Sequence, residues 1–535
     1  MSGAATHARR HPVLLATAIS ALLSAVYLIW QPPSLDLAAQ TFRADLWDRS
    51  GWVVWSDAWY SGHTVPGYSL LFPPLGALLG PELLGALCAV AAAALFATIA
   101  SRAYGERAWL GCAWFGAASV VALYGGRLTF GLGMVLGLAA MLALQRGMTK
   151  RGMAAAALAG LASPVAGLFT ALGAGAVLAA SPSRRGPAGW IAAAALFATA
   201  ALSIAFPTDG YQPFAFSAWI WIPAVALLAL LLLPAEERVL RWGVLLYAAV
   251  GVAAFALDTP LGGNAVRLGT TFAGPLFALA LFGRRPLALA LIAVPLLWWQ
   301  WTATVRDVAA ADGDPSTEAA YYESLLEELE RVSGPAPVRV EVPATRNRWE
   351  AVHVAERFPL ARGWLRQLES EDFTRFTGND LTATEYRQWL YGHGVSYVAL
   401  ADAEPDGLTE DEVELLRRGG LEYLREIWSD DHWTLYEVRD PDGGPAEPEY
   451  ALASGGARVG ELGPDGFSVE VPGPGEYLLR LRYTPYFEIE SGAGCLYDAG
   501  DSTRLTATGP GPQTLEVGAR LSLAGLLRDG EVCSG

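Results

Sequence analysis

The sequence has little charge for its length, and that charge is unevenly placed. Only 17% of the 535 residues are charged, Lys150 is the only lysine, and residues 1–304 carry a net charge of +7 against −23 for residues 305–535. Phosphate backbones are bound by basic faces, so the acidic second half excludes a nucleic-acid-binding protein. With 53% hydrophobic residues and a mean hydropathy of +0.30, the composition instead indicates a multi-span membrane protein.

Cysteine is scarce, with four residues in the chain. Cys88 and Cys112 fall in apolar runs and are interpreted as small core residues. Cys495 and Cys533 lie in the terminal polar segment. Because disulfides persist in oxidising compartments, these two cysteines are expected to pair if that segment faces outward.

The polar second half also lacks recognisable catalytic signatures. It contains no Ser-His-Asp, Cys-His or phosphate-loop pattern, and we assign it no chemistry. Its histidines, His353, His393 and His432, are interpreted as structural.

Long apolar runs dominate residues 1–304. Nine have spanning or near-spanning length: 12–30, 82–101, 109–124, 128–145, 187–206, 218–233, 242–257, 268–282 and 287–304. Residues 152–180 are also apolar, but Ser163-Pro164 breaks them, which predicts two short helices. Together, the nine runs and the two short helices predict a polytopic α-helical membrane protein with about 11 transmembrane helices. Run 12–30 is expected to be retained as a helix, and segment 68–80 to be re-entrant.

Basic residues predict the orientation of these helices. With a cytoplasmic N-terminus, the inner loops of residues 1–304 hold thirteen Lys and Arg residues, whereas the outer loops hold Arg43, Arg49, Arg127 and Arg267. An odd number of spans then places residues 305–535 outside. We therefore predict a multi-pass plasma-membrane protein with extracytoplasmic C-terminal domains.

The second half divides into two expected domains. Residues 305–440 are predicted to form an extracytoplasmic α/β domain, with helices at 316–332 and 409–420 and strands at 338–342, 395–400 and 432–438. Residues 441–449 are predicted to be a linker. Residues 450–535 alternate short apolar runs with Gly/Pro turns, which is typical of a small β-sandwich.

The first outer loop, residues 31–74, is acidic and rich in tryptophan. Its start has apolar residues at helical spacing, which places Asp36, Gln40 and Arg43 on a common face. A carboxylate at a membrane surface can act as general base for a sugar hydroxyl, and an arginine can hold a phosphate leaving group. Aromatic side chains can stack on a sugar.

Further residues of the outer loops are candidates for substrate binding. The set is Asp57, Tyr60, His63, Tyr68, Arg127, Asn264 and Arg267. Simpler interpretations stand beside this one. Asp36 could cap a helix, the arginines could reach lipid headgroups, and the tryptophans could form an interfacial belt. A divalent cation held by Asp36, Asp45, Asp48 and Asp57 is an alternative, but their spacing matches no metal motif, and no metal ligand or other cofactor is assigned.

The order of these motifs resembles the GT-C superfamily of membrane glycosyltransferases. The shared features are a first helix, a long outer loop with an early Asp and Arg, the segment Tyr60-Ser-Gly-His63-Thr-Val-Pro66, and a Tyr68…Pro-Pro-Leu entry to the next helix. The resemblance implies that Asp36 is the catalytic or metal-binding carboxylate. It also implies a polyprenyl-phosphate sugar donor, a cell-wall glycan or glycoprotein acceptor, and inversion. The loop departs from many members in having no adjacent acidic pair.

A second resemblance concerns the polar half. The stretch beginning TRNRWEAVHVAERF, with YRQWLYGHGVSYVAL after it, resembles periplasmic domains of multi-span actinobacterial membrane proteins.

Two other functions are compatible with this organisation. A transporter or flippase for a lipid-linked substrate would need ionisable residues at mid-bilayer depth, and the predicted spans contain almost none. A non-catalytic scaffold would bind cell-wall glycan through the β-sandwich and use the helices as an anchor.

Overall fold

The protein is described from a computed structural model that covers residues 2–207, 210–365, 367–368, 376, 381–440, 451–527 and 530–534. The chain forms two compact units. The helical unit comprises Met1–Asp45 and Gly67–Asp312, and the β-rich unit comprises Leu46–Pro66 and Gly313–Gly535. The predicted linker at 441–449 lies outside the described residues.

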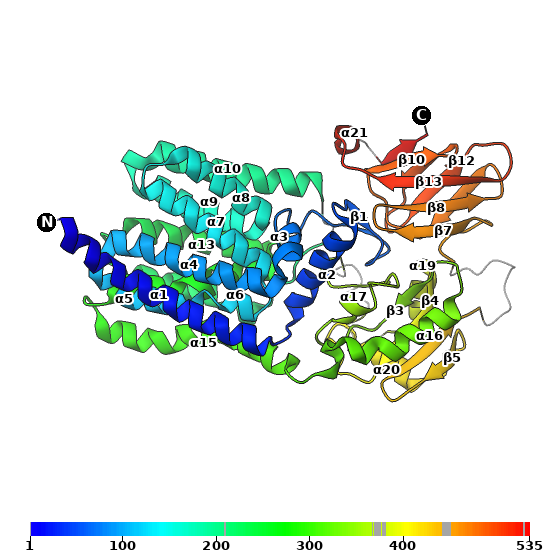
Figure 1. Cartoon of the computed structure of the whole chain (residues 1–535), viewed down its shortest axis with the longest axis horizontal. Coiled ribbons are helices and arrows are strands. Elements are labelled where there is room, and N and C mark those ends of the chain that lie inside the picture. Colours follow the sequence, from blue (N-terminus) through cyan, green and yellow to red (C-terminus); the bar gives the residue numbers. More distant parts are fainter. Residues whose placement is uncertain are drawn as a thin grey trace. The chain divides into compact units, whose positions relative to one another are not determined.

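The helical unit is built from apolar helices (Figure 1). Six segments of the described residues are long and apolar enough to cross a membrane: His11–Trp30, Pro81–Tyr124, Leu128–Gln145, Pro182–Ala205, Arg238–Ala256 and Pro286–Ala311. Two shorter apolar helical segments are Pro164–Ala180 and Phe216–Leu232. These helices agree with a membrane protein, and the count of about 11 crossings stays a prediction.

Helix boundaries in this unit follow its prolines and glycines. Helix α8 (Thr149–Ala162) ends before Pro164, where α9 (Pro164–Ala180) begins, so the predicted break is confirmed. Ser163 caps α9 by accepting a hydrogen bond from the Ala166 N–H. The other helices are α1 (Ser2–Trp30), α2 (Leu35–Ser50), α3 (Phe72–Leu79), α4 (Pro81–Tyr104), α5 (Trp109–Ala118), α6 (Val121–Tyr124), α7 (Leu128–Gln145), α10 (Arg185–Ala205), α11 (Phe216–Trp219), α12 (Trp221–Leu232), α13 (Arg238–Ala256), α14 (Val266–Leu281) and α15 (Pro286–Ala311).

Loops predicted to share one face of the membrane do meet in the helical unit. At the end expected to be cytoplasmic, Glu237 accepts a hydrogen bond from the Tyr104 hydroxyl at 2.7 Å and pairs with Arg284 at 3.2 Å. Arg102 donates to Gln145 at 3.1 Å. These contacts bring together loops that the sequence assigned to one face, while the order and the orientation of the crossings stay predictions.

The first part of the β-rich unit is a four-stranded sheet with strand order β3-β4-β6-β5. Strands β3 (Arg339–Glu341), β4 (Val395–Ala401) and β6 (Trp433–Val438) and helix α20 (Glu410–Arg418) match predicted elements. The prediction missed β5 (Leu424–Ser429) and helix α19 (Ala383–Gly392). The first helix, α16 (Glu323–Ser333), begins later than predicted, because residues 315–322 form two 3₁₀ turns. The short helix α17 is Glu350–His353.

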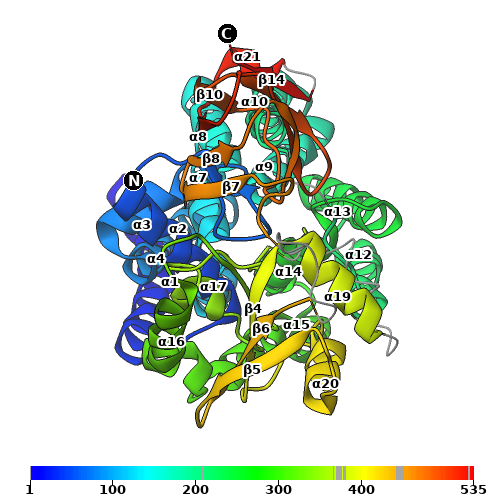
Figure 2. The same cartoon turned by 90° about the vertical axis from the view of Figure 1, so that its right-hand side faces the viewer.

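The second part of the β-rich unit is the predicted sandwich (Figure 2). Its two sheets have strand orders β10-β13-β8-β7 and β14-β11-β12-β9. The strands are β7 (Arg458–Gly463), β8 (Gly466–Val471), β9 (Gly475–Leu479), β10 (Phe487–Ser491), β11 (Gly494–Asp498), β12 (Thr503–Ala507), β13 (Gln513–Ala519) and β14 (Glu531–Cys533). Residues that alternate along these strands fill one apolar core between the sheets.

The middle of residues 31–74, the predicted first outer loop, belongs to this unit and not to the helical one. Residues 46–66 contain a small hairpin of β1 (Trp55–Ser56) and β2 (His63–Thr64). Trp55 is fully buried in the sandwich core, where its ring centroid lies 5.3 Å from that of Phe487 and its indole N–H donates to the Arg482 carbonyl. The Asp465 carboxylate accepts hydrogen bonds from the backbone N–H groups of Val54 and Trp55.

The same loop also binds the α/β part of its unit. Trp59 is fully buried and donates its indole N–H to the Ala351 carbonyl at 3.0 Å. A side chain at Gly363 would place its Cβ 2.4 Å from Trp59, so glycine permits this close approach. The tryptophans at 55 and 59 are thus core residues that join the loop to both parts of the β-rich unit.

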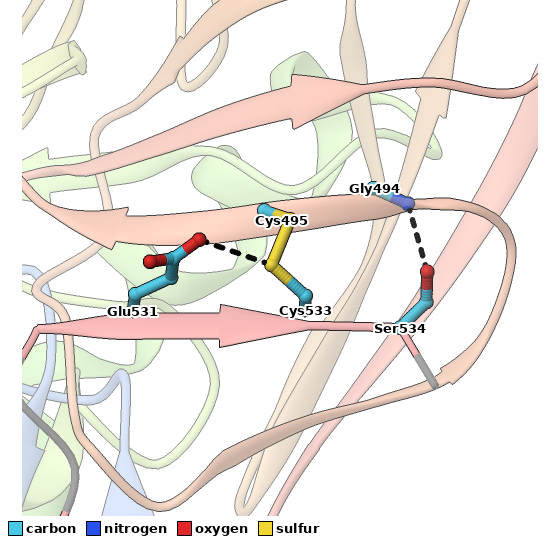
Figure 3. Close-up of a disulfide and its surroundings, with 5 residues drawn as sticks. All are labelled: Gly494, Cys495, Glu531, Cys533 and Ser534. Atoms are coloured by element: carbon cyan, nitrogen blue, oxygen red, sulfur yellow. Dashed lines mark hydrogen bonds between the residues drawn. A yellow bond between two sulfur atoms is a disulfide. The ribbon is translucent and has the colours of Figure 1, made fainter.

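Cys495 and Cys533 form the predicted disulfide (Figure 3). They lie directly opposite each other on the antiparallel strands β11 and β14, which closes a loop of sequence separation 38. Cys88 and Cys112 are free and buried, in agreement with their interpretation as core residues.

Removal of this disulfide should destabilise the sandwich. In the chain-entropy model a loop of this length contributes about 4 kcal/mol. We expect the purified full chain carrying Cys495→Ala and Cys533→Ala to lose its β-sheet circular dichroism at lower temperature than the wild type. A Cys112→Ala variant is the control for loss of a thiol. Reductant should lower the unfolding temperature of the wild type toward that of the double variant. A wild-type unfolding temperature that reductant leaves unchanged would contradict the prediction.

Candidate functional site

The predicted catalytic carboxylate, Asp36, is paired with a predicted phosphate-binding arginine. Asp36 lies in the first turn of α2, and its Oδ2 accepts a hydrogen bond from Arg127 Nε at 2.9 Å. Arg127 is the residue immediately before α7. Both side chains are largely buried, with exposed fractions of 17% and 23%. Residues 91 positions apart thus meet in the helical unit.

A second carboxylate, Asp307, contacts the same arginine. Its Oδ2 lies 3.7 Å from Arg127 Nη2. The sequence interpretation missed Asp307, because it follows the last apolar run and was grouped with the polar half. Its signal in the sequence is an Arg306-Asp307 pair at the end of an apolar helix.

Tyr68 lies between the other two predicted arginines. The Arg43 guanidinium lies 3.9 Å from the centre of the Tyr68 ring, a cation–π distance. Arg267 forms a hydrogen bond with the Tyr68 side chain and lies 5.9 Å from the ring centre of Phe130, in the first turn of α7. We refer to Asp36, Arg43, Tyr68, Arg127, Arg267 and Asp307 as the ionic cluster.

Helix ends reinforce the positive character of the ionic cluster. Asp36 is in the first turn of α2, Arg127 precedes α7, and Arg267 is in the first turn of α14. A helix N-terminus carries partial positive charge, which favours anions and disfavours cations. The six residues of the ionic cluster thus combine three arginines and two carboxylates at or near three helix N-termini, an arrangement that favours anions.

The charges of the cluster influence one another. Burial lowers the pKa of Arg127, but the carboxylates of Asp36 and Asp307 outweigh burial and leave that pKa raised. Arg127 is therefore held as a cation between two anions. An incoming phosphate would compete with both carboxylates for it.

Asp57, Tyr60 and His63 belong to the β-rich unit, whereas the residues of the ionic cluster belong to the helical unit. The Tyr60 hydroxyl donates to the Gly363 carbonyl at 2.8 Å, and His63 stacks on Trp59 with ring centroids 5.1 Å apart. Burial raises the pKa of Asp57 to about 6. All three are buried in this unit, and their roles in substrate binding stay a prediction.

Asn264 lies three residues before Arg267, in the 3₁₀ turn Gly262–Ala265. It is half-buried.

A metal site is a separate question. Among the described residues, one group of three ligand-type side chains lies close enough to hold an ion: Cys495, Glu531 and Cys533. Its two sulfurs are bonded to each other, so they are not thiolate ligands. Asp36 and Asp307 both contact Arg127, and its positive charge balances these carboxylates in place of a metal cation.

Glycine permits the contact between Arg127 and Asp36. Gly126 has φ +67°, and a Cβ there would lie 2.3 Å from Leu37 N and 2.5 Å from Ser34 Oγ. The Gly-Gly-Arg sequence at 125–127 thus packs its backbone directly on the first turn of α2.

Gly126→Ala should displace this turn. The left-handed conformation alone costs about 1–2 kcal/mol for alanine, and the overlap with backbone adds to it. The matched control is Gly147→Ala, which has φ +75° but no atom within 4 Å of its Cβ. We expect Gly126→Ala to lower the thermal unfolding midpoint of the detergent-solubilised protein more than Gly147→Ala does. Equal midpoints would contradict the close approach.

Comparison with known proteins finds no family model that matches the chain and no matching curated protein.

Proposed function

We propose that the protein is a membrane glycosyltransferase that transfers a sugar from a polyprenyl phosphate to a cell-envelope acceptor at the outer face, with inversion. The observation that supports this most is the ionic cluster. Five residues chosen from the sequence for this chemistry, Asp36, Arg43, Tyr68, Arg127 and Arg267, lie together although they come from separate segments. The lipid donor would lie among the bundle's helices, and the acceptor would enter from water.

In this proposal Arg127 and Arg267 bind the donor phosphate. The phosphate competes for the Arg127 guanidinium and so releases the Asp36 carboxylate. Asp36 then accepts the proton of the acceptor hydroxyl while the hydroxyl oxygen attacks the anomeric carbon. The bond from that carbon to the phosphate oxygen breaks, and polyprenyl phosphate leaves, stabilised by the arginines. Asp307 would hold Arg127 in place once Asp36 has been released.

Electrostatics support an anionic, lipid-linked donor. The surplus of arginines and helix N-termini is matched by a phosphodiester, which brings one negative charge and becomes more negative as it leaves. An uncharged sugar donor would leave that surplus uncompensated.

The test is transfer of radiolabelled sugar by the purified full chain from a panel of polyprenyl-phosphate sugars to cell-wall acceptor. Labelled product from one donor would support the proposal. A folded protein that transfers sugar from none of the donors would contradict the proposal. That result would favour a transporter or a glycan-binding scaffold instead.

A further inference from the structure

Exposed apolar side chains of the β-rich unit are concentrated in one short segment, which we call the leucine segment, residues 521–527. Its four leucines have exposed fractions of 46% at Leu521, 78% at Leu523, 39% at Leu526 and 87% at Leu527. Elsewhere among the described residues of this unit, only Trp52 and Leu478 are large, apolar and exposed. Soluble surfaces scatter such residues singly, so a cluster indicates a contact surface.

The leucine segment is held firmly on the sandwich. It contains the short helix α21 (Leu523–Leu526), which lies outside the two sheets (Figures 1 and 2). Ser522 Oγ accepts a hydrogen bond from the Gly525 N–H at 3.0 Å, and the Arg520 N–H donates to the Tyr486 carbonyl at 2.9 Å. A Cβ on Gly525 would lie 2.7 Å from the Tyr486 ring. The glycine side of α21 is therefore seated on the sandwich, and the leucines are held outward.

Charge around the leucine segment differs from that of the surrounding domain. Residues 305–535 carry a net charge of −23, yet no acidic residue occurs between Glu516 and Asp529. Arg520 precedes the leucines, and the next acidic residue, Asp529, directly follows Arg528 outside the described residues. Arg520 pairs with Glu490 at 2.7 Å, but both side chains are exposed, so this pair contributes little and can open.

A bilayer is the surface that complements this pattern. Leucines beside an arginine match acyl chains beneath phosphate headgroups, since apolar side chains enter the boundary and a guanidinium group stays at the phosphates. A bilayer is available to the segment, because the helical unit of the same chain holds helices long and apolar enough to span one. The backbone passes between the two units at residues 45–46, 66–67 and 312–313.

We propose that the leucine segment inserts into the outer surface of the membrane in which the helical unit is embedded. The contact would fix the β-rich unit against the lipid surface. It does not depend on glycosyl transfer, and it holds equally for a transporter or a scaffold.

The test places a probe in the leucine segment of the full-length protein. A Leu523→Cys variant, in a Cys88→Ala and Cys112→Ala background that keeps the Cys495–Cys533 disulfide, is labelled with the environment-sensitive dye NBD. The labelled protein is reconstituted in nanodiscs of phosphatidylcholine and phosphatidylglycerol. We expect blue-shifted NBD emission, and loss of most of that emission when doxyl-labelled lipid is included.

The matched control is the same label at Leu478→Cys, the exposed leucine of β9, which should show emission typical of water and no quenching. Adding Leu526→Ser and Leu527→Ser to the Leu523→Cys protein should reduce the quenching. Two results would overturn the proposal. Emission typical of water at position 523 would leave the segment in solvent. Blue-shifted emission without doxyl quenching would place it against protein, either the helical unit or a second copy.

Discussion

Replacement of Asp36 by asparagine is expected to abolish sugar transfer while the protein remains folded. Asparagine has nearly the same shape but cannot accept the proton of the acceptor hydroxyl, and loss of a general base costs about 10²–10⁴-fold in rate. Asparagine keeps an oxygen that can accept the hydrogen bond from Arg127, and Asp307 still faces that arginine, so we expect the fold to be retained. The measurement is initial rate of transfer, with the thermal unfolding midpoint as a check on folding.

The matched control is Asp48→Asn, which changes an exposed carboxylate on the same helix and should leave the rate unchanged. Binding of polyprenyl phosphate separates two roles for Asp36. Retained binding with lost transfer is expected of a base, whereas lost binding would mean that Asp36 acts by positioning Arg127. Full activity in Asp36→Asn would exclude both roles.

Trp55→Ala should be the most damaging substitution for the β-rich unit. The side chain is fully buried between the sheets, packs on Phe467 and Phe487, and donates a hydrogen bond to the Arg482 carbonyl. Truncating a buried tryptophan costs about 3–5 kcal/mol through lost burial and the cavity left behind. We expect residues 313–535 to become susceptible to protease at lower urea concentration, measured by pulse proteolysis of the full chain.

Trp52→Ala provides the comparison, because Trp52 is in the same loop but 43% exposed. It should leave the urea midpoint almost unchanged. If the two variants are equally resistant, residues 46–66 are not part of the sandwich core, and the tryptophans would return to the interfacial role that the sequence also allowed.

Five of the six residues of the ionic cluster could be predicted from the sequence because they were assigned to loops on the same face of the membrane. Charged residues in an apolar helical protein collect at helix ends, and the positive-inside pattern assigns each end to a face. Asp36, Arg127 and Arg267 were therefore expected at one membrane surface before any contact was known. Sidedness does not give distance within that surface, and the pairing of Asp36 with Arg127 depends on the packing of Gly126 against α2.

Other residues show where this reasoning fails. Asp307 was missed because a boundary drawn at the last apolar residue hides a charged residue on the final turns of the same helix. Tyr60 and His63 were grouped with Asp36 because they share its loop, but they belong to the other unit of the chain, and their role in substrate binding stays a prediction. Neighbours in sequence need not be neighbours in space, and residues 46–66 pack with strands more than 400 positions away.

The sequence by itself determined the division into apolar helices and an acidic second half, the break at Ser163-Pro164, three strands of the α/β part, and the pairing of Cys495 with Cys533. These follow from hydrophobic periodicity, helix-breaking residues and composition, which are local properties of the chain. Only the tertiary structure decided that Trp55 and Trp59 are core residues of the β-rich unit, that Asp307 shares Arg127 with Asp36, and that the four leucines of residues 521–527 remain exposed. Each of these depends on which residues distant in the sequence pack against a side chain, and the local sequence pattern does not identify those residues.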